Sequence, residues 1–425
     1  MKKLISAILM GSIMAGAFCA CTPESPPLDP QKIVNSGKPV DVNIKELSNS
    51  EQADFRRAYL NTSFDLLRLN SENNNNVMIS PASIMIALSM VEAGANGRTA
   101  EQMAALWGGE DDRDAQLSYA AYILNRLNES EGVSMHAADS VWINEEMLEG
   151  LIKGEYVDFV QEYYDAEVNY REFDDNTVRM INSWVDDKTD GMIDEIINSF
   201  EPETAMVLLN AIAFDGSWAE QYEEYQVQDG TFYNADGTET TASMLHGEEG
   251  IFLENDEATG FIKYYDGGQY AFVVMLPKDN NKSADDLLAD FTGDDFDEFM
   301  GSKSYDYEVY TEMPEFEYDW GASIRDTLKE LGMVDAFSQT DADLTGIAAI
   351  DDGYNLYVGN VIHKTHIELS RTGTRAAAVT AVTLDAAGAI AEPNIKYVTC
   401  DRPFAYAIVD MTDETPVFIG TVNNI

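Results

Sequence analysis

The chain has 425 residues, of which 45% are hydrophobic and 24% are charged, so it can bury a large core and is not expected to be disordered. Its 76 acidic residues outnumber its 26 basic residues and give a formal net charge of -50. Nucleic acid is excluded as a partner, because the chain offers no basic surface that could displace counterions from a phosphate backbone.

Residues 1–20 predict a signal peptide. Lys2 and Lys3 precede an apolar run over 4–18, which is too short to span a bilayer. We therefore expect the protein to be exported.

The end of this segment resembles the lipobox of bacterial lipoproteins, because small residues precede a cysteine. Cys21 follows Ala20 and fits better than Cys19, which follows the bulky Phe18. The resemblance implies that Cys21 is lipidated and that residues 21–50 form a lipidated N-terminus and linker. Multiple acylation would hold the protein at a membrane, in the bacterial outer membrane or at the cell surface. A plain cleaved signal peptide, which would leave the protein extracellular, is the alternative.

Apolar spacing predicts the elements after the linker. In chain order they are a helix over 51–69, a loop at 73–76, helices over 84–93 and 115–128, a strand over 133–143, a helix over 176–189, strands over 205–214 and 270–276, a helix over 283–291, a strand over 305–310, a helix over 322–331, and strands over 355–369, 404–410 and 416–422. Helices and strands alternate without a regular repeat. This order predicts a mixed α+β fold with largely antiparallel sheets, in one domain over 51–425.

The commonest catalytic signatures are missing from the sequence, including the Gly-x-Ser-x-Gly elbow, the His-Glu-x-x-His helix and the Gly-x-x-x-x-Gly-Lys loop. Only His136, His246, His363 and His366 could serve as imidazole bases. The last two are three residues apart in an extended segment, so they would point to opposite faces and make a poor metal pair. Cys400 is expected to be a buried structural thiol. We therefore expect no enzyme, no metal and no other cofactor.

Short motifs in residues 53–425 resemble the serpin family of serine protease inhibitors, in family order. The matching segments are NVMISPASI at 76–84, LNAIAFDGSW at 209–218, YAFVVMLP at 270–277, LKELGM at 328–333 followed by Ala336-Phe337, His363-Lys364, Arg402-Pro403-Phe404 and Phe418-Ile419-Gly420. A chance match of single motifs would not keep this order. The resemblance implies the serpin fold, in which mostly antiparallel sheets are surrounded by helices and an exposed reactive-centre loop covers about 371–397.

The resemblance also implies a polar cluster beneath the central sheet, where the strands part to admit the loop. Matched by motif, its members are Ser80, Ser83, Asn210 and His363. Such groups are costly to bury unpaired and favourable when they bond to one another, so they could hold a closed sheet together. Trp218 matches the family's aromatic residue at the upper insertion point.

The segment RTGTRAAAVTAVTLD at 371–385 resembles the hinge of inhibitory serpins. The hinge residues carried over by motif are Gly373, Thr374, Arg375, Ala376, Ala377, Ala378 and Val379. In such inhibitors the protease cuts the loop, becomes acylated and is trapped irreversibly when the loop inserts into the sheet as a new strand.

The residues of this segment fit insertion independently of the resemblance. In a strand the even positions from 374 to 384 share one face and are Thr, Ala, Ala, Thr, Val and Leu, none of them charged. Arg371, Arg375 and Asp385 fall on the opposite face, and no proline precedes Pro393. An ordinary Ala/Thr-rich loop in a non-inhibitory relative is the alternative.

Two hinge positions depart from the family pattern. Inhibitory serpins commonly carry Glu where this chain has Arg371 and favour an acid where it has Arg375. They usually carry Lys where this chain has Glu315. We therefore expect a charge-reversed hinge ion pair between Arg371 and Glu315.

Two scissile bonds remain open. Family spacing from Gly373 indicates Ala387–Gly388, whereas spacing back from Pro393 and Phe404 favours Ala389–Ile390. Either bond follows an alanine, which suits the narrow pocket of elastase-like proteases. We expect a monomer that inhibits an elastase-like serine protease, with cysteine proteases as a further class. A non-inhibitory binding or structural lipoprotein on the same fold is the alternative.

Overall fold

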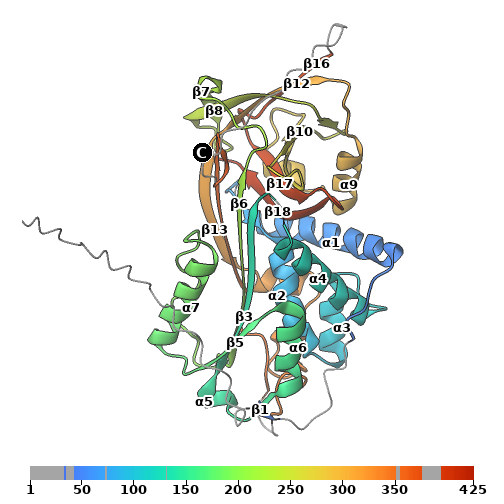
Figure 1. The fold of residues 1–425 in the computed structure, drawn as a ribbon, viewed down its shortest axis with the longest axis vertical. Coiled ribbons are helices and arrows are strands. Elements are labelled where there is room, and N and C mark those ends of the chain that lie inside the picture. The colour runs from blue at the N-terminus through green and yellow to red at the C-terminus, as the bar shows by residue number, and fades with distance from the viewer. Residues whose placement is uncertain (1–32, 35–42, 72–73, 131, 351–354, 376–393) are drawn as a thin grey trace, which may run out of the picture.

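The computed structural model describes residues 33–34, 43–71, 74–130, 132–350, 355–375 and 394–425 (Figure 1). Four sets of predicted features lie outside this part of the chain. They are the signal peptide 1–20, the lipidation site Cys21, the hinge residues Ala376 to Val379, and both candidate scissile bonds between Ala387 and Ile390.

The helices largely follow the predicted positions. They are α1 (Asn49–Asn70), α2 (Pro81–Ala93), α3 (Gly97–Ala105), α4 (Arg113–Asn128), α5 (Glu145–Leu148), α6 (Gly154–Tyr164), α7 (Asp175–Lys188), α8 (Ala284–Leu288), α9 (Gly293–Gly301) and α10 (Arg325–Glu330), with 3-10 turns η2 (Glu224–Gln226) and η3 (Asp335–Phe337). The predictions for α1, α2, α4 and α7 are confirmed within a few residues. No helix in the described part of the chain is long and apolar enough to cross a membrane.

The central sheet has the strand order β13-β14-β15-β6-β3-β5. These strands are β13 (Phe316–Ser323), β14 (Ile362–Ser370), β15 (Gly373–Thr374), β6 (Met206–Ser217), β3 (Ser134–Asn144) and β5 (Glu167–Arg171). Only β3 and β5 pair in parallel. In Figure 1, α7 covers one face of this sheet, and α2, α4 and α6 cover the other.

Three further sheets complete the fold. One contains β2 (Met78–Ile79), β18 (Thr415–Val422), β17 (Phe404–Asp410), β11 (Tyr270–Pro277), β10 (Ala258–Tyr264) and β9 (Phe252–Glu254). Another contains β16 (Ile395–Thr399), β12 (Glu308–Pro314), β8 (Glu239–Glu249) and β7 (Val227–Tyr233). The last pairs β1 (Ile33–Val34) with β4 (Ile152–Lys153). The predicted α+β fold with largely antiparallel sheets is confirmed.

Four predicted boundaries are wrong. The helix expected over 283–291 ends at Leu288, because Thr292 forms the capping box that starts α9. The helix expected over 322–331 begins at Arg325, since residues 322–323 belong to β13. The strands expected over 305–310 and 355–369 begin at Glu308 and Ile362. Apolar runs identify buried segments but do not show where pairing with a neighbouring strand begins.

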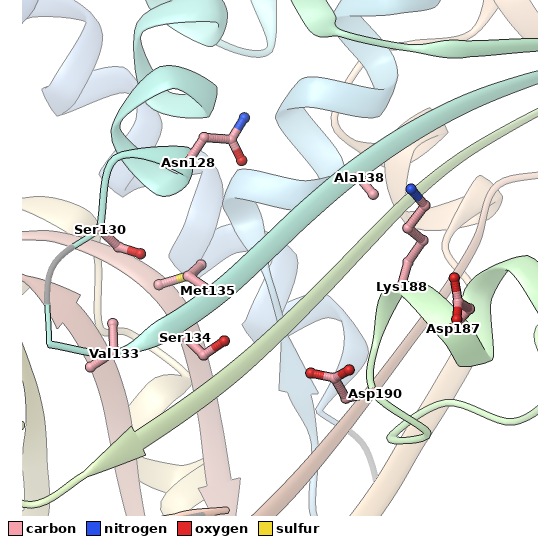
Figure 2. A pocket seen from close by; sticks show the side chains of 9 residues that line it. All are labelled: Asn128, Ser130, Val133, Ser134, Met135, Ala138, Asp187, Lys188 and Asp190. Atoms are coloured by element: carbon pink, nitrogen blue, oxygen red, sulfur yellow. The ribbon is translucent and has the colours of Figure 1, made fainter. Parts of the chain in front are cut away.

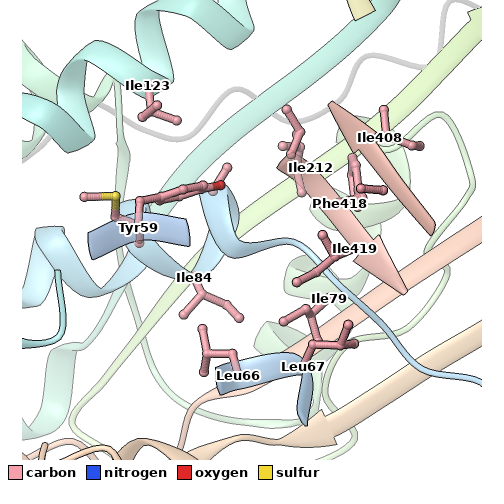
Figure 3. Packing of buried hydrophobic residues seen from close by; sticks show 14 of the residues in the cluster. Tyr59, Leu66, Leu67, Ile79, Ile84, Ile123, Ile212, Ile408, Phe418 and Ile419 are labelled. Atoms are coloured by element: carbon pink, nitrogen blue, oxygen red, sulfur yellow. The ribbon is translucent and has the colours of Figure 1, made fainter. Parts of the chain in front are cut away.

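The core is built around α2. Ser80 caps this helix by accepting the Ser83 N–H, and Pro81 occupies the first turn, where its missing N–H costs nothing. Nearly every residue of α2 is buried, because α1, α4, β6 and β18 pack around it. Figure 3 shows Ile84 of α2 with Leu66 and Leu67 of α1 in this cluster. The cluster extends from Leu47 to Val422, so distant parts of the chain share one core.

Candidate functional site

The hinge enters the central sheet by two residues. Thr374 pairs antiparallel with Leu369 of β14 on one side and with Gly216 of β6 on the other. In the described part of the chain, β14 and β6 are paired with β15 and not with each other. The strand ends at Thr374, and the next residue, Arg375, has φ +40° and donates its N–H to the Glu368 carbonyl. The two residues of β15 therefore lie between β14 and β6 at this end of the sheet.

Thr374 faces the core, as the predicted alternation requires. Its side chain is 3% exposed, and its hydroxyl shares a hydrogen bond of 2.6 Å with the Tyr265 hydroxyl. Burial raises the pKa of Tyr265 above its ordinary value, so this phenol stays neutral. Tyr265 gave no signal in the sequence, because it follows β10 and lies 109 residues from Thr374 along the chain.

Trp218 holds the turn that precedes the hinge, and its predicted role at an insertion point stays a prediction. Its ring N–H donates to the Ser370 carbonyl at 2.9 Å and its backbone N–H donates to the Thr372 carbonyl at 3.0 Å. The ring stacks on Tyr265 with centroids 4.5 Å apart. Both ends of the hinge turn are thus fixed by one residue at the end of β6.

A buried ion pair supports this aromatic stack. Lys263 Nζ lies 2.8 Å from Glu249 Oε1 and 5.5 Å from the Trp218 ring centroid, and the Lys263 side chain is 5% exposed. The same ammonium lies 4.3 Å from the Tyr222 ring. A buried lysine persists only when it is paired, so this contact orders β8 and β10 beneath Trp218. The sequence shows only one lysine in an apolar run and does not reveal its partner.

Glu315 contacts Arg371, but its carboxylate contacts the Arg371 backbone and not the Arg371 side chain. Glu315 Oε1 accepts the Arg371 backbone N–H at 2.8 Å. No ion pair between the two side chains is present among the described residues, and the Arg371 side chain is exposed. The turn between β14 and β15 directs the Arg371 N–H at the Glu315 carboxylate. The predicted charge-reversed pair between the two side chains stays a prediction.

Three of the four predicted polar residues come together. His363 Nε2 accepts the Ser80 N–H at 2.9 Å, and the Ser80 hydroxyl accepts the Ser83 N–H at 3.2 Å. Burial lowers the pKa of His363 to about 4, so its ring is neutral at physiological pH. The neighbouring Thr365 hydroxyl donates to the Met78 carbonyl at 2.8 Å. These hydrogen bonds connect β14 to β2 and to the start of α2.

Asn210 is hydrogen bonded elsewhere. Its side-chain amide donates to Asp139 Oδ1 at 2.9 Å, across the β3–β6 pair. The reason is the register of β3 with β6, which places Asp139 directly opposite Asn210. Asn210 Oδ1 and Asp139 Oδ2 are buried without a hydrogen-bond partner in the described residues. The sequence did not single out Asp139, because acidic residues are abundant throughout the chain.

The Asp139 carboxyl is 2% exposed, and burial raises its pKa to about 7. The nearby Asp165 carboxylate adds to this shift, whereas the Asn210 hydrogen bond opposes it. The β3–β6 pair therefore contains a carboxyl group that changes its charge near neutral pH.

A cavity of about 470 Å³ lies at the edge of β3, between the ends of α4 and α7 (Figure 2). It is lined by Asn128, Ser130, Val133, Ser134, Met135, Ala138, Asp187, Lys188 and Asp190. Lys188 Nζ forms an ion pair of 2.8 Å with Glu167.

Cys400 is fully buried and forms no disulfide in the described part of the chain, and burial raises the pKa of its thiol. The predicted structural thiol is therefore confirmed. His363 and His366 point to opposite faces of β14, as expected, since His363 is buried and His366 lies on the face that carries the exposed Glu368.

Comparison with protein families matches residues 57–425 to the family described as serpin (serine protease inhibitor). An uncharacterized serpin-like protein of Thermococcus kodakarensis is 30% identical over 366 residues, covering 85% of this chain and 83% of the relative. Antithrombin-III of Homo sapiens is 26% identical, covering 96% of this chain and 91% of its own length.

Among solved structures, the thermophilic serpin tengpin in its native state matches with a TM-score of 0.81 and 33% identity, covering 90% of this chain and 96% of tengpin. The latent state of tengpin matches with a TM-score of 0.75 and 30% identity, covering 89% and 99%. Thyroxine-binding globulin in complex with thyroxine has a TM-score of 0.74 at 23% identity, covering 87% and 98%, which shows likeness of fold alone.

Proposed function

Because this chain belongs to the serpin family, we propose that it inhibits a serine protease by offering the loop after β15 as bait and trapping the enzyme once the loop is cut. The observation that carries the proposal is the position of the hinge. Gly373 and Thr374 already pair with both β14 and β6, which are not paired with each other in the described residues. A cut loop could continue this strand without breaking an existing ladder.

The register of β15 supports insertion further down the sheet. Extending the pairing of Thr374 with Leu369 and Gly216 by antiparallel steps would bring Thr380 opposite His363 and Asn210. Thr380 would share their inward face, and its hydroxyl could bond the buried Asn210 Oδ1, which lacks a partner in the described residues. Thr380 would thus join the polar cluster and supply the hydrogen-bond donor that Asn210 Oδ1 lacks in the described residues.

We further propose an elastase-like target, because Ala387 or Ala389 would precede the cut and a small side chain suits a shallow specificity pocket. Cysteine proteases are a further class of target in this proposal. The test incubates the purified chain with elastase. We expect a covalent complex that survives denaturing electrophoresis, and a released peptide whose mass identifies cleavage at Ala387–Gly388 or at Ala389–Ile390.

Nicking the loop with a non-target protease tests the same insertion without a trapped enzyme. An inserted strand of about ten residues adds on the order of 10 kcal/mol in hydrogen bonds, so the midpoint of heat inactivation should rise by at least about 10 °C. Cleavage with neither a complex nor this gain would contradict trapping and support a non-inhibitory binding protein.

We also propose that the protein is exported and lipidated at Cys21. The first described residues after this cysteine, Ile33 and Val34, pair with β4. In Figure 1, β1 lies at the end of the molecule opposite β16, to which the reactive loop returns. An anchor on the side of β1 would leave β16 at the end of the molecule away from the membrane. Cys21→Ser should move the protein from the membrane fraction to the soluble fraction, and continued membrane binding would exclude this anchor.

A further inference from the structure

We propose that β13 and β14 carry a binding site for a divalent transition-metal ion, made by Glu317, His366 and Glu368. One ligand atom from each residue lies within 4.8 Å of the other two. All three side chains project from the outward face of the central sheet, where β13 and β14 expose alternate residues. This site is independent of the inhibitory function proposed above.

The strand register holds the three ligands together. Glu317 lies directly opposite Glu368, and Asp319 lies directly opposite His366, two residues further along both strands. Directly opposite and diagonal residues on one face of an antiparallel pair are near neighbours. The β13–β14 pairing is continuous from Phe316 to Ser323, so the ligands stand on a rigid base.

Asp319 orients the His366 ring. Asp319 Oδ1 lies 2.8 Å from His366 Nδ1, and in the tautomer that donates this hydrogen bond Nε2 is left to bind a metal ion. Histidine ligands commonly make this second hydrogen bond to a carboxylate, because it fixes the tautomer and raises the basicity of the coordinating nitrogen. Asp319 is thus a positioning residue, and the metal ligand is the imidazole.

The charge at the site calls for a cation. Glu317 and Glu368 are like charges directly opposite one another, an arrangement that destabilises a strand pair. Neither forms an ion pair with any residue in the described part of the chain. The nearby cations are engaged elsewhere, since Lys364 donates to the Glu195 carbonyl and Arg375 donates to the Asp190 carbonyl. A bound divalent ion would relieve this repulsion.

One imidazole with two carboxylates suits Zn²⁺, which takes such ligands at about 2.0–2.2 Å and leaves a fourth position for water. Ligand atoms around tetrahedral zinc are about 3.4 Å apart. The exposed glutamate side chains therefore need to move by only about 1 Å. The ion would tie β14 to β13, and β14 is the strand beside which the hinge has entered.

The test titrates Zn²⁺ into the full chain, purified without a histidine tag and stripped with chelator. We expect saturable binding of one ion per chain and a higher melting temperature in excess Zn²⁺. His366→Gln should weaken binding at least about tenfold, and Asp319→Asn should weaken it about tenfold through orientation of the ring. His246→Gln, which alters a histidine of β8 in another sheet, is the matched control and should bind like the parent chain.

Three results would overturn the site. They are absence of saturable Zn²⁺ binding, parent-like binding by both His366→Gln and Glu317→Gln, or Ca²⁺ binding of equal strength that survives His366→Gln. The last result would mean that the acidic surface attracts cations without a defined site. Circular dichroism of each variant checks that the fold is intact.

Discussion

Replacing Ala378 by Lys is expected to abolish the covalent complex with elastase while leaving cleavage of the loop intact. Continuing the register of β15 would bring residue 378 opposite Thr365 of β14 and Ile212 of β6, on the inward face. Both neighbours are buried, with exposures of 3% and 5%. An unpaired ammonium there costs several kcal/mol, so insertion slows and the acyl-enzyme is hydrolysed before it is trapped.

The neighbouring alanine provides a matched control. Ala377→Lys makes the same chemical change one residue earlier, on the outward face, opposite His366. A long side chain there can keep its charge in solvent, so this variant should still form the complex. The measurement is the ratio of covalent complex to cleaved chain on a denaturing gel. Equal behaviour of the two variants would mean that the loop does not insert in this register.

Replacing Asp139 by Asn is expected to stabilise the protein above neutral pH. Burial raises the pKa of Asp139 from 3.8 to about 7, so between these values the folded state holds a proton that the unfolded state releases. Stability is therefore lost as the pH rises through this window. At about 1.4 kcal/mol per pH unit the full loss reaches on the order of 4 kcal/mol. Asn removes the ionisation and can keep a hydrogen bond with Asn210.

The measurement is thermal unfolding of both proteins at pH 5 and pH 8. The advantage of Asp139→Asn should grow by about 3 kcal/mol between these two values. Asp256→Asn is the control, because Asp256 is exposed in the turn between β9 and β10, in another sheet from the β3–β6 pair. An advantage that does not change with pH would show that Asp139 does not titrate in this window.

Local patterns predicted the segments whose partners lie nearby or whose burial is nearly complete. The helices α1, α2, α4 and α7 follow from apolar periodicity, and the start of α2 follows from Ser80 and Pro81, since capping is a property of adjacent residues. Shorter elements such as α3 and β5 were not predicted. Their formation depends on contacts outside the segment itself, since α3 packs against α2, α4 and η3, and β5 pairs with β3.

The residues of the candidate site also fall into a group that the sequence predicted and a group that it did not. Ser80, Ser83 and His363 were found through motifs, whereas Asp139, Tyr265, Lys263 and Glu249 were not, because their roles come from partners in other strands. The prediction for Asn210 missed its partner for the same reason. The Glu317, His366 and Glu368 group was also missed, since only the register of β13 with β14 assembles it.

The sequence by itself predicted which residues of the hinge share a face, because alternation in a strand depends only on residue order. The buried Thr374 agrees with that assignment. Only the tertiary structure decided that the hinge enters between β14 and β6 and that Glu315 meets the Arg371 backbone. It also decided that Asn210 pairs with Asp139. The physical reason is that cross-strand contacts depend on register and strand order, which long-range packing sets and local residue patterns do not encode.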